Sequence, residues 1–252
     1  DLDYSGISTA DINIAYDFVN KWNCSGTKVR RYLNAAKAIE TIRMNLKASS
    51  WIKLKIDVSS VSPDVAILIE DELELAKTEV ENIEFIESIN NALKGGGPVG
   101  NIGTVAIELL DTGKLDKCIR FATSISRLRN DSKALLETSE LILKNRVSLA
   151  KGNFEDIVSV QDKDITAFHS IAHQELKRMR QEKENYLLTK ALIAAMEIGK
   201  VTGIPGKIER DSISCKAITD AVKLSEKYGV LSLEANGLME DCEKLSKLRN
   251  EC

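Results

Sequence analysis

The sequence contains little proline and few aromatic residues. Only 3 of its 252 residues are proline, and 5% are Phe, Trp or Tyr. Because proline interrupts helices, this scarcity, together with abundant Leu, Ile, Ala, Lys and Glu, predicts an all-α fold. The apolar content of 43% and the charged content of 29% indicate an ordered chain and argue against intrinsic disorder.

Histidine and cysteine are scarce in the patterns that site chemistry needs. The two histidines, His169 and His173, leave little room for a Ser–His–Asp or Cys–His arrangement. The five cysteines are odd in number and widely spaced, and none forms a CxxC pair. This usage argues against a disulfide framework and a zinc site, and it favours a reducing, cytoplasmic compartment. We therefore predict no enzymatic activity, no catalytic or cofactor-binding residues and no cofactor.

Long apolar runs and an excess of one charge are also missing. No run approaches the ~18 apolar residues needed to span a bilayer, so we predict no membrane partner. The net charge of −3 gives no electrostatic reason to expect nucleic acid. No signal peptide is visible, yet the chain begins at Asp1 rather than Met. We therefore expect a segment of a longer protein.

The sequence does contain an internal repeat. Residues 72–103 align without a gap to residues 175–206, and the recurring residues are Glu, Asn, Gly, Leu and Ala. Such self-similarity is typical of stacked supersecondary units. The matched positions in the first copy are Glu72, Leu73, Glu79, Glu81, Asn82, Ala92, Gly96, Gly100 and Gly103.

The repeat predicts an elongated, antiparallel helical stack with units of about 103 residues. We place a partial first repeat at residues 1–61, a complete second repeat at 62–161 and a truncated third repeat at 162–252. Each unit would hold one long helix, a glycine-rich turn and shorter helices. A pair of fused helical bundles fits the same pattern.

Capping and turn residues predict where the helices lie. The long helices are expected from about Ser62 to Lys94 and from about Ile165 to Gly199. Further helices are expected over about 10–22, 28–47, 104–110, 114–128 and 130–151. Short helices are expected near Trp51 and Phe154.

The opening stretch, residues 1–11, carries acidic or hydroxyl groups at Asp1, Asp3 and Ser5, followed by Gly6. This spacing resembles an EF-hand calcium loop, and the resemblance implies calcium ligands at Asp1, Asp3, Ser5 and Asp11. Asp11 comes one residue before the family's bidentate glutamate position and is one methylene shorter. An ordinary turn with a helix cap explains the same residues.

Three other stretches have a functional and a structural interpretation. His169 and His173 would share one helix face, as two metal ligands or as solvated side chains. The glycine-rich turn, residues 95–103, would cradle a phosphate or simply join two helices. The basic run from Lys177 to Lys183 would form a partner-binding face, or a solvated face with the ion pairs Arg178–Glu182 and Arg180–Glu184. We favour the structural interpretation of each.

The function predicted from these features is non-catalytic. We expect a helical repeat segment that scaffolds other proteins within a larger protein, or within a cytoskeletal or multi-subunit assembly. An exposed apolar patch on the long helices would mark the docking surface. The alternative is a calcium-responsive regulatory module that uses the opening loop.

Overall fold

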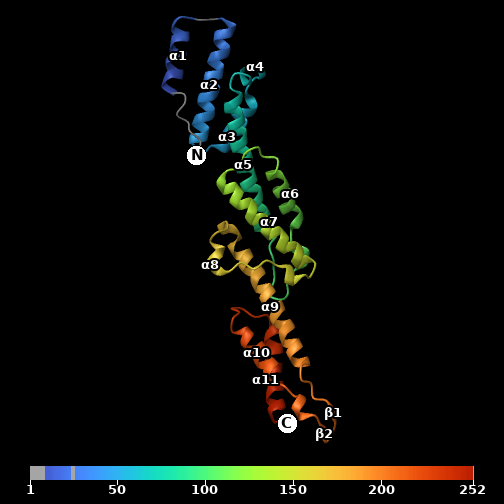
Figure 1. Cartoon of the computed structure of the whole chain (residues 1–252). Helices are drawn as coiled ribbons and strands as arrows, with labels where there is room; N and C mark the ends of the chain where they lie inside the picture. The colour runs from blue at the N-terminus through green and yellow to red at the C-terminus, as the bar shows by residue number, and fades with distance from the viewer. Residues whose placement is uncertain (1–8, 24–25, 252) are drawn as a thin grey trace. The chain divides into compact units, whose positions relative to one another are not determined.

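The computed structural model describes residues 9–23 and 26–251 (Figure 1). The fold is all-α in character, since 73% of the residues are helical and almost none lie in strands. Within the described ranges, no helix combines the length and apolarity required to cross a bilayer.

The α-helices follow one another along the chain, with longer connections between α5 and α6 and between α9 and α10. Their bounds are α1 (Thr9–Lys21), α2 (Thr27–Lys47), α3 (Trp51–Ser60), α4 (Pro63–Ala66), α5 (Glu70–Gly95), α6 (Thr112–Ala122), α7 (Asn130–Ala150), α8 (Asp162–Ile165), α9 (His173–Glu197), α10 (Lys216–Ser225) and α11 (Leu233–Glu251). Four short 3₁₀ helices complete the helical elements of the described residues: η1 (Ile107–Leu109), η2 (Phe154–Asp156), η3 (Ser170–Ala172) and η4 (Arg210–Ser212).

The chain divides into two compact units. Unit 1 comprises residues 1–88 and 121–132, and unit 2 comprises residues 89–120 and 133–252. This division follows contacts rather than sequence similarity, so the three-repeat organisation remains a prediction.

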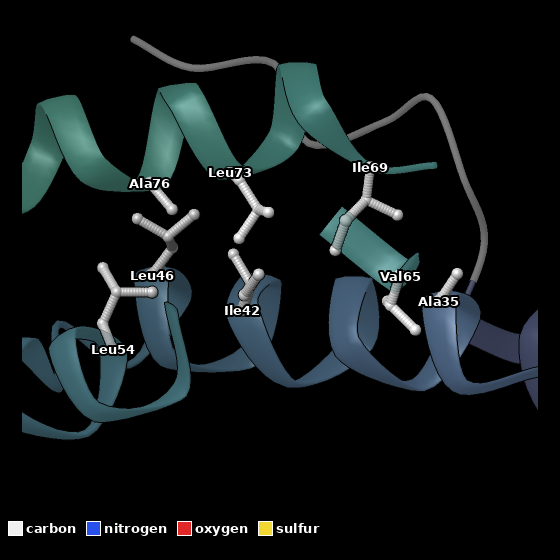
Figure 2. Packing of buried hydrophobic residues seen from close by; sticks show 8 residues of the cluster. All are labelled: Ala35, Ile42, Leu46, Leu54, Val65, Ile69, Leu73 and Ala76. Carbon is white, nitrogen blue, oxygen red and sulfur yellow. The ribbon is translucent and has the colours of Figure 1, made fainter. Parts of the chain in front are cut away.

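The core of unit 1 lies where α2 faces α5. Figure 2 shows Ile42 and Leu46 of α2 directed toward Leu73 and Ala76 of α5. Val65 of α4 joins the same cluster, together with Ala35, Leu54 and Ile69. Each Val, Leu or Ile side chain of this cluster contributes roughly 1.5–3 kcal/mol when it is fully buried.

Two apolar clusters among the described residues of unit 2 involve α9. One gathers Leu188 and Leu192 of α9 against Ile218 of α10 and Cys242 of α11. The other is smaller and joins Leu149, Ile157 and Met179. The long helix α9 therefore contributes to both of these clusters.

The predicted long helices are each interrupted near their start. The first breaks between α4 and α5, where Leu68 donates its backbone N–H to the Val65 carbonyl (2.9 Å) and Ile69 to the Ala66 carbonyl (3.2 Å). These i to i+3 bonds interrupt the α-helical pattern, and Val65 and Ile69 both belong to the cluster around Ile42 (Figure 2). In the second, α8 and η3 precede α9, so the predicted start at Ile165 is wrong.

A small β-hairpin was not predicted. Strands β1 (Gly203–Ile204) and β2 (Lys207–Ile208) pair antiparallel, with Gly203 opposite Ile208 and Ile204 opposite Lys207. Pro205 and Gly206 form its two-residue turn. Proline fixes φ for the first turn position, and Gly206 adopts φ +83°, which glycine accommodates without steric cost.

Candidate functional site

Most of the predicted calcium loop lies outside the described residues. This applies to Asp1, Asp3 and Ser5. Asp11 is described: it is exposed in the first turn of α1. Among the described residues, no group of three or more His, Cys, Asp or Glu side chains is arranged to hold a metal ion.

The two histidines do not share a helix face. His169 precedes η3 and caps it, since its Nδ1 accepts a hydrogen bond from the Ile171 N–H (3.4 Å). His173 begins α9, and its Nε2 lies 2.8 Å from the Phe168 carbonyl oxygen. The prediction that they lie at i and i+4 of one helix is therefore wrong, because the chain turns between them.

The basic run of α9 forms both predicted ion pairs. Arg178 pairs with Glu182 (2.7 Å) and Arg180 with Glu184 (3.4 Å). The predicted solvated face is wrong, however, because the Glu182 side chain is only 1% exposed and that of Arg180 only 12%. Burial also raises the pKa of Glu184 above its ordinary value. These charges therefore lie at a packed junction, where ion pairs are screened less than at the surface.

The glycine-rich turn packs against this part of α9. Arg178 donates from Nη1 to the Gly100 carbonyl (2.8 Å) and from Nη2 to the Asn101 carbonyl (2.7 Å). The Gly103 N–H donates to Glu182 Oε2 (2.9 Å). Arg178 and Glu182 of α9 therefore both bind the backbone of the turn.

Close packing restricts Gly103. Its φ of +84° lies in the left-handed region, and an added Cβ would meet the Ser232 Cβ at 2.8 Å. Both the backbone conformation and the contact with Ser232 therefore require glycine at this position.

A buried arginine lies beside the same turn. Arg146 is 0% exposed and donates from Nε and Nη2 to the two oxygens of Glu175, at 2.6 and 2.7 Å. Its Nη1 donates to the Asp111 carbonyl (2.7 Å). This two-point geometry is the strongest form of an arginine–carboxylate pair.

Asp111 also caps the helix that follows it. Its Oδ1 accepts from the Lys114 N–H (2.8 Å), and this hydrogen bond is the main reason that the pKa of Asp111 lies below its ordinary value. One residue therefore joins the Arg146 contact to the start of α6.

An equivalent arginine–glutamate pair occurs in unit 1. Arg43 donates from Nε to Glu72 Oε1, and both side chains are largely buried. Arg43 and Glu72 precede Arg146 and Glu175 by 103 residues each. The same pair of residue types thus joins a helix end to the following long helix in each unit.

An asparagine on each long helix holds the loop between the two helices that follow. In unit 1, Asn82 donates to the Arg127 carbonyl (2.9 Å) and accepts from the Arg129 N–H (2.9 Å). The side chain of Asn82 is fully buried. The Asn82 amide therefore supplies hydrogen-bond partners for one backbone carbonyl and one backbone N–H of a loop that lies outside regular secondary structure.

The same hydrogen bonds recur 103 residues later in unit 2. Asn185 donates to the Val230 carbonyl (2.8 Å) and accepts from the Ser232 N–H (2.6 Å). Asn82 and Asn185 each also donate to the carbonyl four residues earlier. The recurring asparagine therefore has one structural role at both positions.

Exposed apolar side chains are not concentrated on the long helices, where we expected them. On α5 and α9 the exposed large apolar residues are Leu75 and Ile193. More of them lie on α1, directly after it and on α2, and these are Ile14 (66% exposed), Phe18 (60%), Trp22 (64%), Val29 (37%), Tyr32 (54%) and Met44 (61%). We call this group the α1–α2 surface.

Comparison with models of known protein families, with curated proteins and with solved structures found no match for this chain. The site therefore has to be interpreted from its own residues. Each unit contains one arginine–glutamate junction and one asparagine-held loop, and unit 1 also carries the exposed α1–α2 surface.

Proposed function

We propose that this chain is a non-catalytic helical repeat segment that holds other proteins within a larger protein or a cytoskeletal or multi-subunit assembly. Repeat proteins of this kind bury only their repeat interfaces and present the remaining helix faces to partners.

The polar junctions support the repeat part of the proposal. Both arginine–glutamate pairs and both asparagine clamps recur at the same spacing of 103 residues. Buried polar groups need specific partners, so they admit one packing register, whereas apolar contacts tolerate several. Recurrence of the whole set favours one repeated structural unit.

The α1–α2 surface carries the docking part of the proposal. Tyr32 on α2 is 54% exposed, whereas Leu135, which follows it by 103 residues on α7, is fully buried. Phe18 on α1 is 60% exposed and lies 6.1 Å from Trp22, ring centroid to ring centroid. Exposed apolar patches rich in aromatic residues are typical of protein interfaces.

The test is retention of specific proteins by the whole 252-residue chain from a native lysate. A second bait carries Phe18→Asp and Tyr32→Asp, which place charges on the α1–α2 surface. A control bait carries Ile52→Asp, because Ile52 is 80% exposed but lies on α3. Circular dichroism melts establish that all three baits are folded.

The proposal predicts that a few proteins are retained by the original and control baits and lost from the doubly charged bait. Each retained protein is then purified and its binding to the three baits is measured directly. Retention that is the same with all three baits, or no specific retention, contradicts docking through this surface.

A further inference from the structure

The helix pair α1–α2 has the same place in the repeat as the pairs α6–α7 and α10–α11. Both ends of α2 (Thr27–Lys47) precede those of α7 (Asn130–Ala150) by the repeat spacing of 103 residues. The starts of α1 and α6 differ by the same spacing, and α11 starts two such spacings after α2. The three pairs therefore occupy equivalent positions in the sequence.

The second half of α9 covers the pair α10–α11. Its residues Leu188, Leu192 and Ala195 belong to one buried cluster with residues of α10 and α11. One turn earlier, Asn185 holds the loop between α10 and α11. The same pattern, Asn-x2-apolar-x3-apolar-x2-Ala, is buried on α5 at Asn82, Phe85, Ile89 and Ala92.

On the pair α1–α2, which lie side by side (Figure 1), the equivalent apolar positions are exposed. Val29 is 37% exposed, whereas the residues at its position in the other pairs, Ser132 and Ala235, are fully buried. Trp22 is 64% exposed, against 7% at Ile125. Together with the exposed Tyr32, these side chains form an apolar face around the connection between α1 and α2. This face corresponds to the one that α9 covers on α10 and α11.

The connection between α1 and α2 also has the position that an asparagine binds in the other pairs. Gly26 is equivalent to Arg129 and Ser232, whose backbone N–H groups donate to Asn82 and Asn185. Gly26 is exposed and directly precedes α2. Its N–H is therefore placed to receive an asparagine from a helix that covers the pair.

We propose that the α1–α2 surface binds the second half of a long helix from a further unit of this repeat, with the pattern Asn-x2-apolar-x3-apolar-x2-Ala. The asparagine accepts from the Gly26 N–H, and the apolar side chains cover Trp22, Val29 and Tyr32. The occupant is a repeat helix rather than an unrelated apolar segment, because both long helices of this chain carry this pattern and bury all four residues. The inference names the partner of the α1–α2 surface and so rests on the proposed function.

The probe is a fluorescein-labelled peptide with the sequence of residues 180–197, which contains the pattern of α9. A lactam between Lys190 and a glutamate introduced at Ala194 keeps the peptide helical, since both positions are exposed on α9. Binding to the whole chain is followed by fluorescence anisotropy, and the helicity of each peptide is checked by circular dichroism.

Two adjacent residues of the peptide provide a matched pair of variants. Leu192 is fully buried on α9, whereas Ile193 is 46% exposed. We expect saturable binding that Leu192→Asp weakens about tenfold or more, because a carboxylate would enter an apolar contact. Ile193→Asp should leave binding within about twofold of the original peptide. Asn185→Ala should weaken binding about fivefold, since it removes the hydrogen bond to Gly26.

Variants of the chain locate the bound peptide. Val29→Asp should weaken binding about tenfold or more, because it places a charge in the middle of the proposed contact. Ile52→Asp, at an exposed position of α3, should leave binding unchanged. Circular dichroism melts of both chain variants establish that they are folded.

Three results overturn the inference: no saturable binding of the helical peptide, equal weakening by Leu192→Asp and Ile193→Asp, and binding that Val29→Asp does not change. In the last case the peptide has bound elsewhere, for example in place of α9. Failure of the peptide is distinct from failure of the proposed function. If the bait with Phe18→Asp and Tyr32→Asp loses proteins that the original bait retains while the peptide does not bind, the surface docks proteins but its occupant is not a repeat helix.

Discussion

Replacing Glu175 by alanine should destabilise unit 2 strongly. The substitution leaves the guanidinium of Arg146 buried at 0% exposure, with only the Asp111 carbonyl as an acceptor. Removing one partner of a buried ion pair typically costs about 3–5 kcal/mol, because the remaining charge is uncompensated. With a urea m-value of about 1–3 kcal/mol/M, the unfolding midpoint of unit 2 should fall by one to several molar.

The positions of the tryptophans make this effect measurable in one unit at a time. Trp22 and Trp51 both belong to unit 1, and they are the only tryptophans of the chain. Tryptophan fluorescence therefore follows unit 1, whereas circular dichroism at the helical band follows both units. We expect Glu175→Ala to shift part of the circular dichroism transition and to leave the fluorescence transition in place.

A matched variant distinguishes the effect of leaving Arg146 without its carboxylate from the general effect of removing a glutamate from α9. Glu197→Ala removes a glutamate of the same helix whose ion pair with Lys200 is exposed. Exposed pairs of this kind contribute about 0–1 kcal/mol, so the urea midpoint should hardly move. Equal shifts for Glu175→Ala and Glu197→Ala would refute the argument that Arg146 depends on its carboxylate partner.

Four further predictions concern single positions. Gly103→Ala should destabilise unit 2 by about 1–3 kcal/mol more than Gly206→Ala in urea unfolding, because φ is alike and only the first position is crowded; equal losses would contradict this. Asn185→Ala should cost about 1–3 kcal/mol by the same assay, since a buried donor and acceptor lose their partner; a loss below about 0.5 kcal/mol, the level of surface substitutions, would contradict the clamp. Asp111→Ala should cost about 1 kcal/mol at pH 6. Folding lowers the pKa of the Asp111 carboxyl below 3.8, so its contribution to stability is present above pH 3.8 and fades as the pH falls through the folded pKa. If the difference in free energy of unfolding between Asp111→Ala and the original chain is unchanged down to pH 3, the helix-capping role of Asp111 is contradicted. Millimolar calcium should leave the melting temperature of the chain unchanged, because Asp11 comes one residue before the bidentate glutamate position of an EF-hand loop and its side chain is one methylene shorter. A calcium-dependent rise in the melting temperature that Asp3→Ala abolishes would instead favour the regulatory alternative.

Local sequence signals placed the helices whose ends carry capping or breaking residues. The predicted helix over 130–151 agrees with α7 because Asn130 and Asp131 favour a helix start and Gly152 favours an end. The predicted helix over 28–47 likewise agrees with α2. These signals act through backbone conformation, so they are visible in the sequence without knowledge of the tertiary contacts.

The interruptions of the long helices have no such signal. The run from Val65 to Ile69 is entirely apolar and contains neither glycine nor proline, so its periodicity reads as a continuous helix. The chain turns there although Val65 and Ile69, four residues apart, would share one face of a continuous helix, so their apolar spacing does not reveal the break. The break before α9 is of the same kind, and it separates the two histidines.

The site residues were visible in the sequence as recurring positions, but their roles were not. Glu175 and Asn185 stood out because they repeat Glu72 and Asn82. Helical periodicity assigns charged residues to solvent, so the basic run of α9 was predicted to be solvated although it lies at a junction. Burial of a charge depends on which element packs over it, and that information is absent from a local pattern.

The two long helices share their polar contacts more closely than their apolar ones. Leu73 recurs as Leu176, but Ala76 becomes Met179 and Val80 becomes Lys183. An apolar position accepts such changes when its neighbours repack, whereas an arginine fork or an amide clamp fails if its partner moves by about 1 Å. Lys183 shows how far the apolar stripe can vary: its ammonium donates to the carbonyls of Glu155 and Ile157, at 2.8 and 2.6 Å. The recurring glutamates and asparagines therefore define the spacing of the structure, and the apolar residues supply its stability around them.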